Sequence, residues 1–200
     1  MSATPDDILP PYQGLALSGV LVVKSTSDAA SALQALAAAD VIGFDTESKP
    51  TFAKGEESTG PHLVQLATDD TAYLFQIGAR RDEATTALLP LLRTVLESDA
   101  ILKVGFGLGD DLRRVRAKLG IEPQNVLDLS TALRRRGERN PLGAKTAVAR
   151  FFSQALTKSK RITTTNWALP RLSEKQILYA ADDAHVALRI YRRWRAQDAA

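Results

Sequence analysis

The chain of 200 residues has no cysteine, only two histidines and no long apolar run. The lack of cysteine excludes disulfides, thiolate nucleophiles and zinc sites built on cysteine. A cysteine-free chain fits a reducing compartment, so we expect a cytoplasmic protein. No stretch approaches the roughly 18 apolar residues that cross a bilayer. The acidic, proline-containing start MSATPDDILPPYQG lacks the composition of a signal peptide. We therefore expect no contact with membranes.

The composition is that of an ordinary globular protein, with 44% hydrophobic and 24% charged residues. Pro5, Pro10 and Pro11 predict a flexible N-terminal arm over residues 1–13. Residues 14–200 are then long enough for a single domain with a sizeable core. The net charge of +3 is too small to argue for a nucleic-acid partner. Lysine and arginine do, however, gather in the C-terminal half, and no protein partner can be inferred.

Short apolar runs alternate with amphipathic segments along the chain. We expect strands at residues 20–23, 41–47, 63–67, 72–77, 101–106 and 126–129. We expect helices from a cap at Ser27 or Asp28 to near Asp40, and at 82–97, 108–119 and 173–194. Because helices and strands alternate after an early hairpin, the pattern predicts an α/β fold with a mixed sheet covered by helices.

Acidic residues stand where buried elements end. Asp45 and Glu47 close the apolar run VIGFDTE and are two apart, so both side chains project from one face of a strand. That geometry lets two carboxylates reach one pair of metal ions. Taken alone, the pair also fits a solvated strand end.

The second acidic segment is KVGFGLGDDL, which opens a helix. Asp111 flanks the apolar stripe of this helix, whereas Asp110 points nearly the opposite way. The stripe is formed by Leu108, Leu112, Val115 and Leu119. We therefore expect Asp111 inside and Asp110 in solvent, although an inward acid beside a glycine turn is also compatible with a helix cap.

The third acidic segment is LYAADDAH in the last helix. Tyr179 and Asp183 are four apart, so they lie on one face, together with Val186 and Ile190. Asp182 falls instead on the polar arc with His185, and we expect both side chains to be solvated. Tyr179 by itself also fits a packing role.

The three segments together predict a metal site. A buried carboxylate without a partner is costly, and a cluster of carboxylates needs cations. Ligands that are all oxygen atoms suit Mg²⁺ or Mn²⁺, and pairs of such ions cleave phosphodiesters. The three acidic segments together are stronger evidence for a metal site than any one of them alone.

The motifs FDTE, KVGFGLGDD and YAADD resemble the three exonuclease motifs of the DEDD superfamily, in the subgroup with tyrosine in the last motif. The segments DTESKPTF, HLVQLA and LTKSKRITTTNWALPRLSEKQILYAADDAH are similar to RNase D and to Werner-type exonuclease domains. The resemblance covers about residues 20–194. No helicase domain or RNase D helical domain follows, so the chain looks like the standalone form.

The resemblance implies a ribonuclease-H-like fold and a 3′→5′ exonuclease that releases nucleoside 5′-monophosphates. It implies that two divalent ions, Mg²⁺ or Mn²⁺, are bound by Asp45, Glu47, Asp111 and Asp183. It further implies that Tyr179 helps to position the attacking water, and Glu47 can orient the same water by a hydrogen bond. His62 and His185 match no role in this family.

The expected contacts with nucleic acid are less specific. Lys158, Lys160 and Arg161 form a basic stretch suited to phosphates, preceded by the arginines at 134–136. Each stretch also fits a solvated surface. Phe52 is a candidate for contacting the terminal nucleotide, whereas Trp167 is expected to pack the turn before the last helix.

The substrate is therefore expected to be the 3′ end of DNA or RNA. DNA, as in a repair nuclease, is narrowly favoured because the segments around Phe52 and in the last helix look nearer to the Werner type. The alternatives are an RNase D-like enzyme that processes RNA 3′ ends and a nucleic-acid-binding module without catalysis. The intact set of five site residues argues against the binding module.

Overall fold

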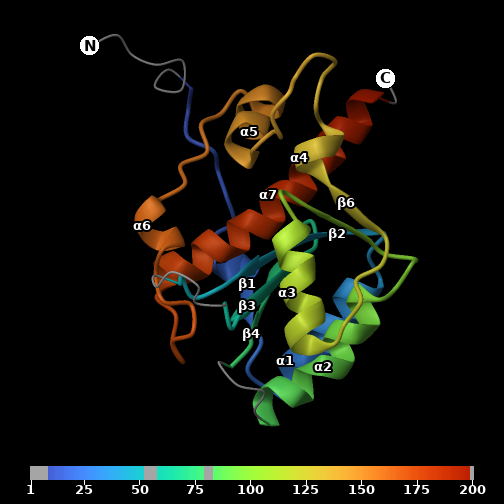
Figure 1. Ribbon diagram of the computed structural model, residues 1–200, viewed down its shortest axis with the longest axis vertical. Helices are drawn as coiled ribbons and strands as arrows, with labels where there is room; N and C mark the ends of the chain where they lie inside the picture. Colours follow the sequence, from blue (N-terminus) through green and yellow to red (C-terminus); the bar gives the residue numbers. More distant parts are fainter. Residues whose placement is uncertain (1–8, 52–57, 79–82, 199–200) are drawn as a thin grey trace.

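A six-stranded mixed sheet forms the centre of the computed structural model, which describes residues 9–51, 58–78 and 83–198 (Figure 1). At four of these positions, residues 83, 84, 160 and 198, the side chain is not described. The strand order is β1-β4-β3-β2-β5-β6, and β3 alone runs antiparallel to its neighbours. The strands are β1 Val20–Val22, β2 Val41–Glu47, β3 Leu63–Ala67, β4 Ala72–Gln76, β5 Leu102–Gly105 and β6 Val126–Asp128. The predicted α/β fold is confirmed, and all six expected strands are present.

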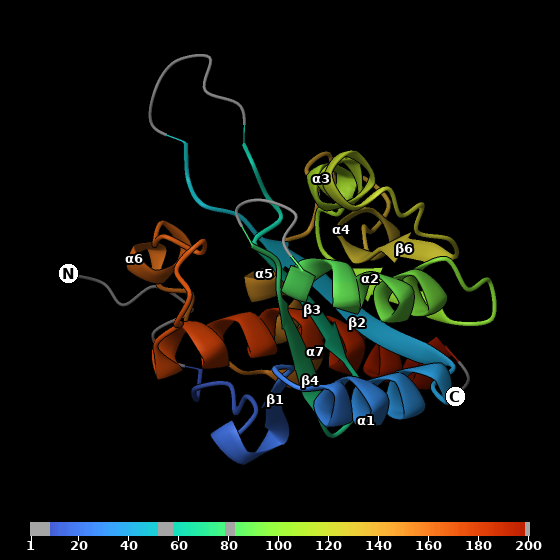
Figure 2. The ribbon, with the colours of Figure 1, turned by 90° about the horizontal axis from the view of Figure 1, so that it is seen from below.

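Helices cover both faces of this sheet (Figures 1 and 2). They are α1 Thr26–Ala37, α2 Glu83–Leu96, α3 Gly109–Leu119, α4 Leu129–Ala132, α5 Ala144–Phe152, α6 Lys160–Thr163 and α7 Glu174–Asp198, with a 3₁₀ turn η2 at Leu17–Gly19. One core cluster joins α1, α2 and α3 to one face, and a second joins α5 and α7 to the other. Within the described ranges, no helix combines the length and apolarity needed to cross a bilayer.

Alternation along β2 divides the strand between the two layers. Ile42 and Phe44 are buried toward α1 and α2, while Val41 packs toward α7. Gly43 lies on the α7 side, where a Cβ atom would come within 1.9 Å of the Ala184 carbonyl oxygen. Only glycine lets the backbones of β2 and α7 approach this closely. The approach brings the acids of α7 beside those of β2.

The start of α1 differs from the sequence prediction. Ser25, not Ser27 or Asp28, is the cap, because its hydroxyl accepts a hydrogen bond of 3.1 Å from the Asp28 amide. The Asp28 carboxylate in turn accepts a bond of 3.0 Å from the Ser25 amide. Asp28 therefore serves as the third helical residue of a capping box, a position that the sequence pattern does not distinguish from the cap itself.

The segment before the first strand packs on the domain. The sequence predicts a flexible arm over residues 1–13, of which 1–8 lie outside the described residues. Pro11 forms a bridge with Ala155, and the Tyr12 amide donates to the Ala155 carbonyl at 3.0 Å. The Arg189 guanidinium lies 5.3 Å from the Tyr12 ring centroid. Residues 10–13 thus belong to the packed structure, and the packed part begins before Gly14.

Asp182 holds the same segment and is not the solvated residue that the helical pattern predicts. Its Oδ1 accepts a hydrogen bond of 2.8 Å from the Leu15 amide. A Cβ atom at Gly14 would lie 2.2 Å from this oxygen, so a side chain there would displace the Asp182 carboxylate. The helical period misplaced Asp182 because the N-terminal segment covers that arc of α7.

Replacing Asp182 with alanine should therefore affect stability more than catalysis. We expect Asp182→Ala to lower the free energy of unfolding by about 1–2 kcal/mol, since the half-buried Leu15 amide loses its acceptor. Turnover per folded molecule should be retained. Urea denaturation and specific activity measured on one preparation test this, and lost turnover at unchanged stability would contradict it.

Candidate active site

Three elements meet at the C-terminal end of β2. Asp45 and Glu47 end this strand, Asp111 lies in the first turn of α3, and Asp183 lies in α7. Burial raises the pKa of the Asp45 carboxyl well above its usual range, and the charges of Asp183, Asp111 and Glu47 raise it further. The structure thus brings together the four carboxylates that the sequence predicts as metal ligands, while their role stays a prediction.

The other three carboxyls also carry raised pKa values. Burial, followed by the charge of Asp183, raises the pKa of Glu47 to about 8. Burial raises the pKa of Asp111, against a hydrogen bond from the Thr46 hydroxyl that lowers it. Burial raises the pKa of Asp183, against the nearby Lys158 ammonium. The cluster therefore contains more negative charge than its buried position favours, and cations would stabilise it.

Lys158 is part of this cluster. Its Nζ lies 2.7 Å from Asp183 Oδ1, and the Asp183 side chain is only 7% exposed. Nζ also lies 5.9 Å from the centre of the Tyr179 ring. The sequence predicts Lys158 as a phosphate contact on a basic stretch, and the structure places its ammonium among the carboxylates.

Tyr179 lies one turn before Asp183 on α7. Its hydroxyl is 2.9 Å from the Thr163 hydroxyl in α6. Burial, and then the charge of Asp183, raises the Tyr179 pKa to about 12, so the phenol stays protonated near neutral pH. Trp167 is 1% exposed and donates from Nε1 to the Thr163 carbonyl at 3.3 Å. The expectation that Trp167 packs the turn before the last helix is confirmed.

Two further residues set the position of Asp111, and the sequence reading missed both. Thr46, between the two acids of β2, donates its hydroxyl to Asp111 Oδ1. Asp128, at the end of β6, accepts hydrogen bonds from the Gly107 amide at 2.9 Å and the Leu108 amide at 3.0 Å. Asp128 thereby fixes the turn from which α3 starts. Its position at a strand end was the only available signal, and nothing in the sequence linked it to the glycine turn.

Asp110 points away from the cluster, as the helical pattern predicts. Its side chain is 66% exposed and forms an ion pair of 3.0 Å with Arg113. The preference for Asp111 over Asp110 as the inward acid is therefore confirmed.

The four carboxylates fit divalent ions by their chemistry. As the side chains stand, the described residues include no group of three His, Cys, Asp or Glu side chains that could hold a metal ion. The Lys158 ammonium occupies Oδ1 of Asp183, and the Thr46 hydroxyl occupies Oδ1 of Asp111. The raised pKa values nevertheless mark a site that lacks positive charge, and all of its donors are oxygen atoms, which Mg²⁺ and Mn²⁺ prefer.

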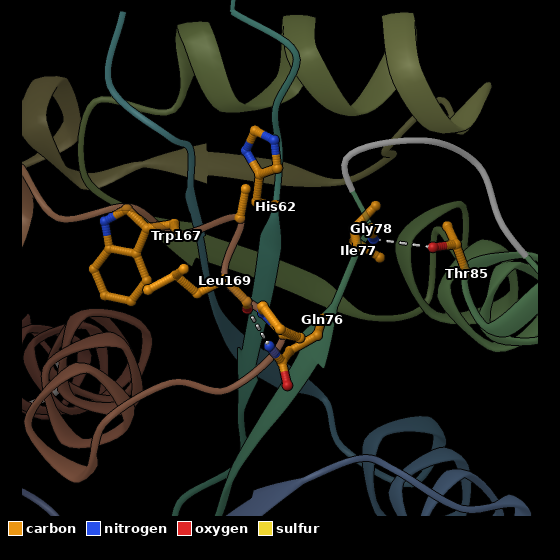
Figure 3. Close-up of a pocket in the computed structure, with 9 residues that line it drawn as sticks. His62, Gln76, Ile77, Gly78, Thr85, Trp167 and Leu169 are labelled. Carbon is orange, nitrogen blue, oxygen red and sulfur yellow. Dashed lines mark hydrogen bonds between the residues drawn. The ribbon is translucent and has the colours of Figure 1, made fainter.

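Two cavities flank the site. One of about 500 Å³ lies between the turn before α3 and the start of α5, and its lining includes Gly107, Lys145 and Lys158. The other, of about 340 Å³, lies beyond the ends of β3 and β4 and is lined by His62, Gln76, Trp167 and Leu169 among others (Figure 3). The site carboxylates are not in the described lining of either cavity.

Neither histidine is solvated. His185 is 5% exposed, and its Nε2 lies 2.9 Å from the Asp69 carbonyl oxygen. The sequence prediction of a solvated His185 is therefore wrong, because the turn between β3 and β4 covers this part of α7. His62 is 1% exposed, and its Nδ1 accepts a hydrogen bond of 3.0 Å from the Lys49 amide.

His62 should make stability depend on pH. Burial, and then the charge of Lys118, lowers the His62 pKa from 6.5 to about 4. The unfolded chain binds a proton more readily, so stability is lost as the pH falls from 6.5 toward 4. At pH 4.5 the loss from this group is about 2–3 kcal/mol.

The variant His62→Gln isolates this contribution from that of the acids. When the pH is lowered from 7.5 to 4.5, the free energy of unfolding should fall by about 2–3 kcal/mol less in the variant than in the unmodified protein. Chemical denaturation at the two pH values measures the difference. Parallel pH profiles for the two proteins would show that His62 does not titrate in this way.

The remaining predicted contacts with nucleic acid are only partly described. Phe52 and the side chain of Lys160 lie outside the described part of the chain. Arg161 is exposed on α6, and the arginines at 134–136 are exposed between α4 and α5. Exposure permits a phosphate contact at these positions, and their role stays a prediction.

Comparisons with known proteins show similarity to exonucleases. Residues 20–197 match the family described as 3'-5' exonuclease. A 3'-5' exonuclease of Arabidopsis thaliana is 27% identical over 156 residues, covering 76% of this chain and 51% of that protein. The bifunctional 3'-5' exonuclease/ATP-dependent helicase WRN of Mus musculus is 27% identical over 77% of this chain and 11% of its own length. Ribonuclease D of Bartonella henselae is 28% identical over 85% of this chain and 39% of its own length.

A solved structure is similar over nearly the whole chain. The EXO domain of Aedes aegypti Nibbler has a TM-score of 0.75 and 27% identity, with 92% of this chain and 90% of that chain covered. The chain spans about half the length, or less, of the curated relatives described above. The family match covers all three acidic motifs and all six strands. The chain therefore belongs to the 3'-5' exonuclease family and carries its ribonuclease-H-like domain.

Proposed function

We propose that this protein is a divalent-metal-dependent 3′→5′ exonuclease that releases nucleoside 5′-monophosphates. The observation that carries the proposal is the convergence of four partly buried carboxylates from β2, α3 and α7, with the Tyr179 hydroxyl beside them. Such a cluster destabilises the fold unless cations bind it. All four residues are partly exposed, which leaves the cluster accessible to a chain end.

Each residue of the site has a distinct part in this proposal. Asp45, Glu47, Asp111 and Asp183 hold two ions, Mg²⁺ or Mn²⁺, through carboxylate oxygens. When bound, the ions activate water and stabilise the leaving oxygen. Glu47 accepts a hydrogen bond from the attacking water, and the protonated Tyr179 donates one. Thr163 orients the Tyr179 hydroxyl through their hydrogen bond.

We infer that Lys158 moves away from Asp183 when this carboxylate binds an ion, because the ammonium and the ion compete for its oxygens. Its ammonium then lies at the edge of the 500 Å³ cavity, whose lining also includes Lys145. Two lysines at one opening suit the phosphates of an incoming strand. We place the last phosphates of the substrate in this cavity, with the 3′ end at the carboxylates.

DNA is the proposed substrate, with RNA as the alternative. The segments around Phe52 and in the last helix resemble the Werner type, which supports DNA. The similarity to ribonuclease D supports RNA, since the name of that relative states a ribonuclease. A nucleic-acid-binding module without catalysis is the alternative from another class, and the complete set of carboxylates speaks against it.

A single set of digestions tests these alternatives. DNA and RNA strands of one sequence, both labelled at the 5′ end, are incubated with EDTA-stripped protein and then with Mg²⁺ or Mn²⁺. We expect turnover only with added ion, and faster shortening of the DNA. Faster shortening of the RNA would favour the ribonuclease alternative, and binding without turnover under all conditions would favour the binding module.

A further inference from the structure

Gln65, in the middle of β3, is fully buried at 0% exposure. Neither Oε1 nor Nε2 of its amide has a hydrogen-bond partner among the described residues. Buried amides in native proteins are nearly always paired, because an unpaired one costs its full desolvation energy. An unpaired glutamine at the centre of the sheet therefore indicates a function that offsets this cost.

The register of the sheet places Gln65 beside the active site. Gln65 lies directly opposite Asp45 in the antiparallel pair of β2 and β3. Directly opposed side chains have Cβ atoms about 4.5–5.5 Å apart. Both side chains point toward α7, since Leu63 and Ala67, which share the face of Gln65, pack against Ala180, Ala181 and Ala184 of this helix.

The other neighbours of Gln65 offer its amide little. Its registered partner on β4 is Leu74, which is apolar and fully buried. The α7 residues that pack on this part of β3 are alanines. Among these neighbours, the Asp45 carboxylate is the polar group toward which the amide can turn.

We propose that Gln65 is a positioning residue for Asp45: with ions bound, its Nε2–H donates to the carboxylate oxygen of Asp45 that faces away from them. Carboxylates that ligate metals are commonly held by an outer hydrogen bond, which fixes the direction of their ligating oxygen. Because an amide is neutral, Gln65 can orient Asp45 without competing with the ions as the Lys158 ammonium does. This inference rests on the proposed metal-dependent function.

The variant Gln65→Met tests the proposal, because methionine keeps the length of the side chain and removes both polar atoms. Mn²⁺ is titrated calorimetrically into metal-free protein without substrate. We expect the dissociation constant for Mn²⁺ to rise about 10–100-fold. The Tm of the metal-free variant should rise by about 2–4 °C, because the unpaired amide is gone. Gln65→Leu provides a second variant should methionine pack poorly.

Gln176→Leu is the matched control. Gln176 is 6% exposed, and its amide is paired with Ser173 and with the Thr165 hydroxyl at 3.1 Å. This change should lower the Tm and leave the Mn²⁺ affinity unchanged, the reverse of the result expected at Gln65.

Two results would overturn the inference. A Mn²⁺ affinity within twofold of that of the unmodified protein in both Gln65 variants would show that Gln65 does not position Asp45. A lowered Tm with unchanged affinity would assign it to packing alone. Neither result would affect the proposed function if the unmodified protein shows metal-dependent turnover, because only the role of Gln65 would then be wrong. An unmodified protein that binds no Mn²⁺ would overturn both.

Discussion

Asp45→Asn is expected to reduce turnover at least about 10³-fold and to raise the stability of the metal-free protein. The Asp45 carboxylate is partly buried, and burial together with three neighbouring acids raises its pKa. A folded-state pKa above the unfolded value means that ionisation destabilises the fold as the pH rises through that range. Asparagine removes the charge at nearly constant volume, so it removes this cost. It also removes an ion ligand, so it removes catalysis.

Asp110→Asn is the control for this prediction. Asp110 is 66% exposed in the first turn of α3, and its ion pair with Arg113 is a surface pair that contributes little. Turnover and stability should both stay near those of the unmodified protein. Thermal unfolding in EDTA and rates at saturating Mg²⁺ measure the two properties. An Asp45→Asn variant that is active, or less stable without metal, would contradict the assignment.

Tyr179→Phe is expected to slow turnover by about 10²-fold while the fold survives. The phenol is protonated at neutral pH and bonded to the Thr163 hydroxyl at 2.9 Å, so it can donate to a water at the site. Loss of one positioning hydrogen bond accounts for a slowing of this size. The ring still packs beside Trp167, so the free energy of unfolding should change by about 1 kcal/mol or less.

Tyr73→Phe is the matched control, because Tyr73 is 7% exposed in β4 on the face that packs toward α1 and α2. The same loss of a hydroxyl there should leave the rate unchanged. Thr163→Val should give a smaller loss than Tyr179→Phe, since the phenol remains but its orientation is freer. Normal turnover in Tyr179→Phe would make Tyr179 a packing residue.

The features that the sequence predicts correctly are those that depend on the spacing of apolar residues along the chain. The strands at 41–47 and 63–67 were placed with correct bounds, because unbroken apolar runs between turn residues identify buried strands. The inward direction of Asp111 followed from the helical stripe, since Val115 and Leu119 are indeed buried. These features depend on neighbours in the chain, which a sequence displays.

The sequence failed where the deciding contact is distant along the chain. Asp182 and His185 were placed in solvent, but the Leu15 amide and the Asp69 carbonyl meet them from remote segments. The sequence predicts Lys158 as a phosphate contact and gives no sign of its ion pair with Asp183, which lies 25 positions away along the chain. In the sequence, Gln65 is a single polar residue within the apolar segment LVQLA, and nothing there marks it as part of a site. Only the register of the sheet shows that Gln65 lies opposite Asp45.

The most direct measurement of the central claim is the direction and product of digestion. A 5′-labelled single strand is incubated with the protein and Mg²⁺, and the released nucleotides are identified by mass and chromatography. The account predicts a ladder that shortens from the 3′ end, nucleoside 5′-monophosphates as products, and no activity after EDTA treatment. Release of 3′-monophosphates, or cuts within a circular strand, would contradict it.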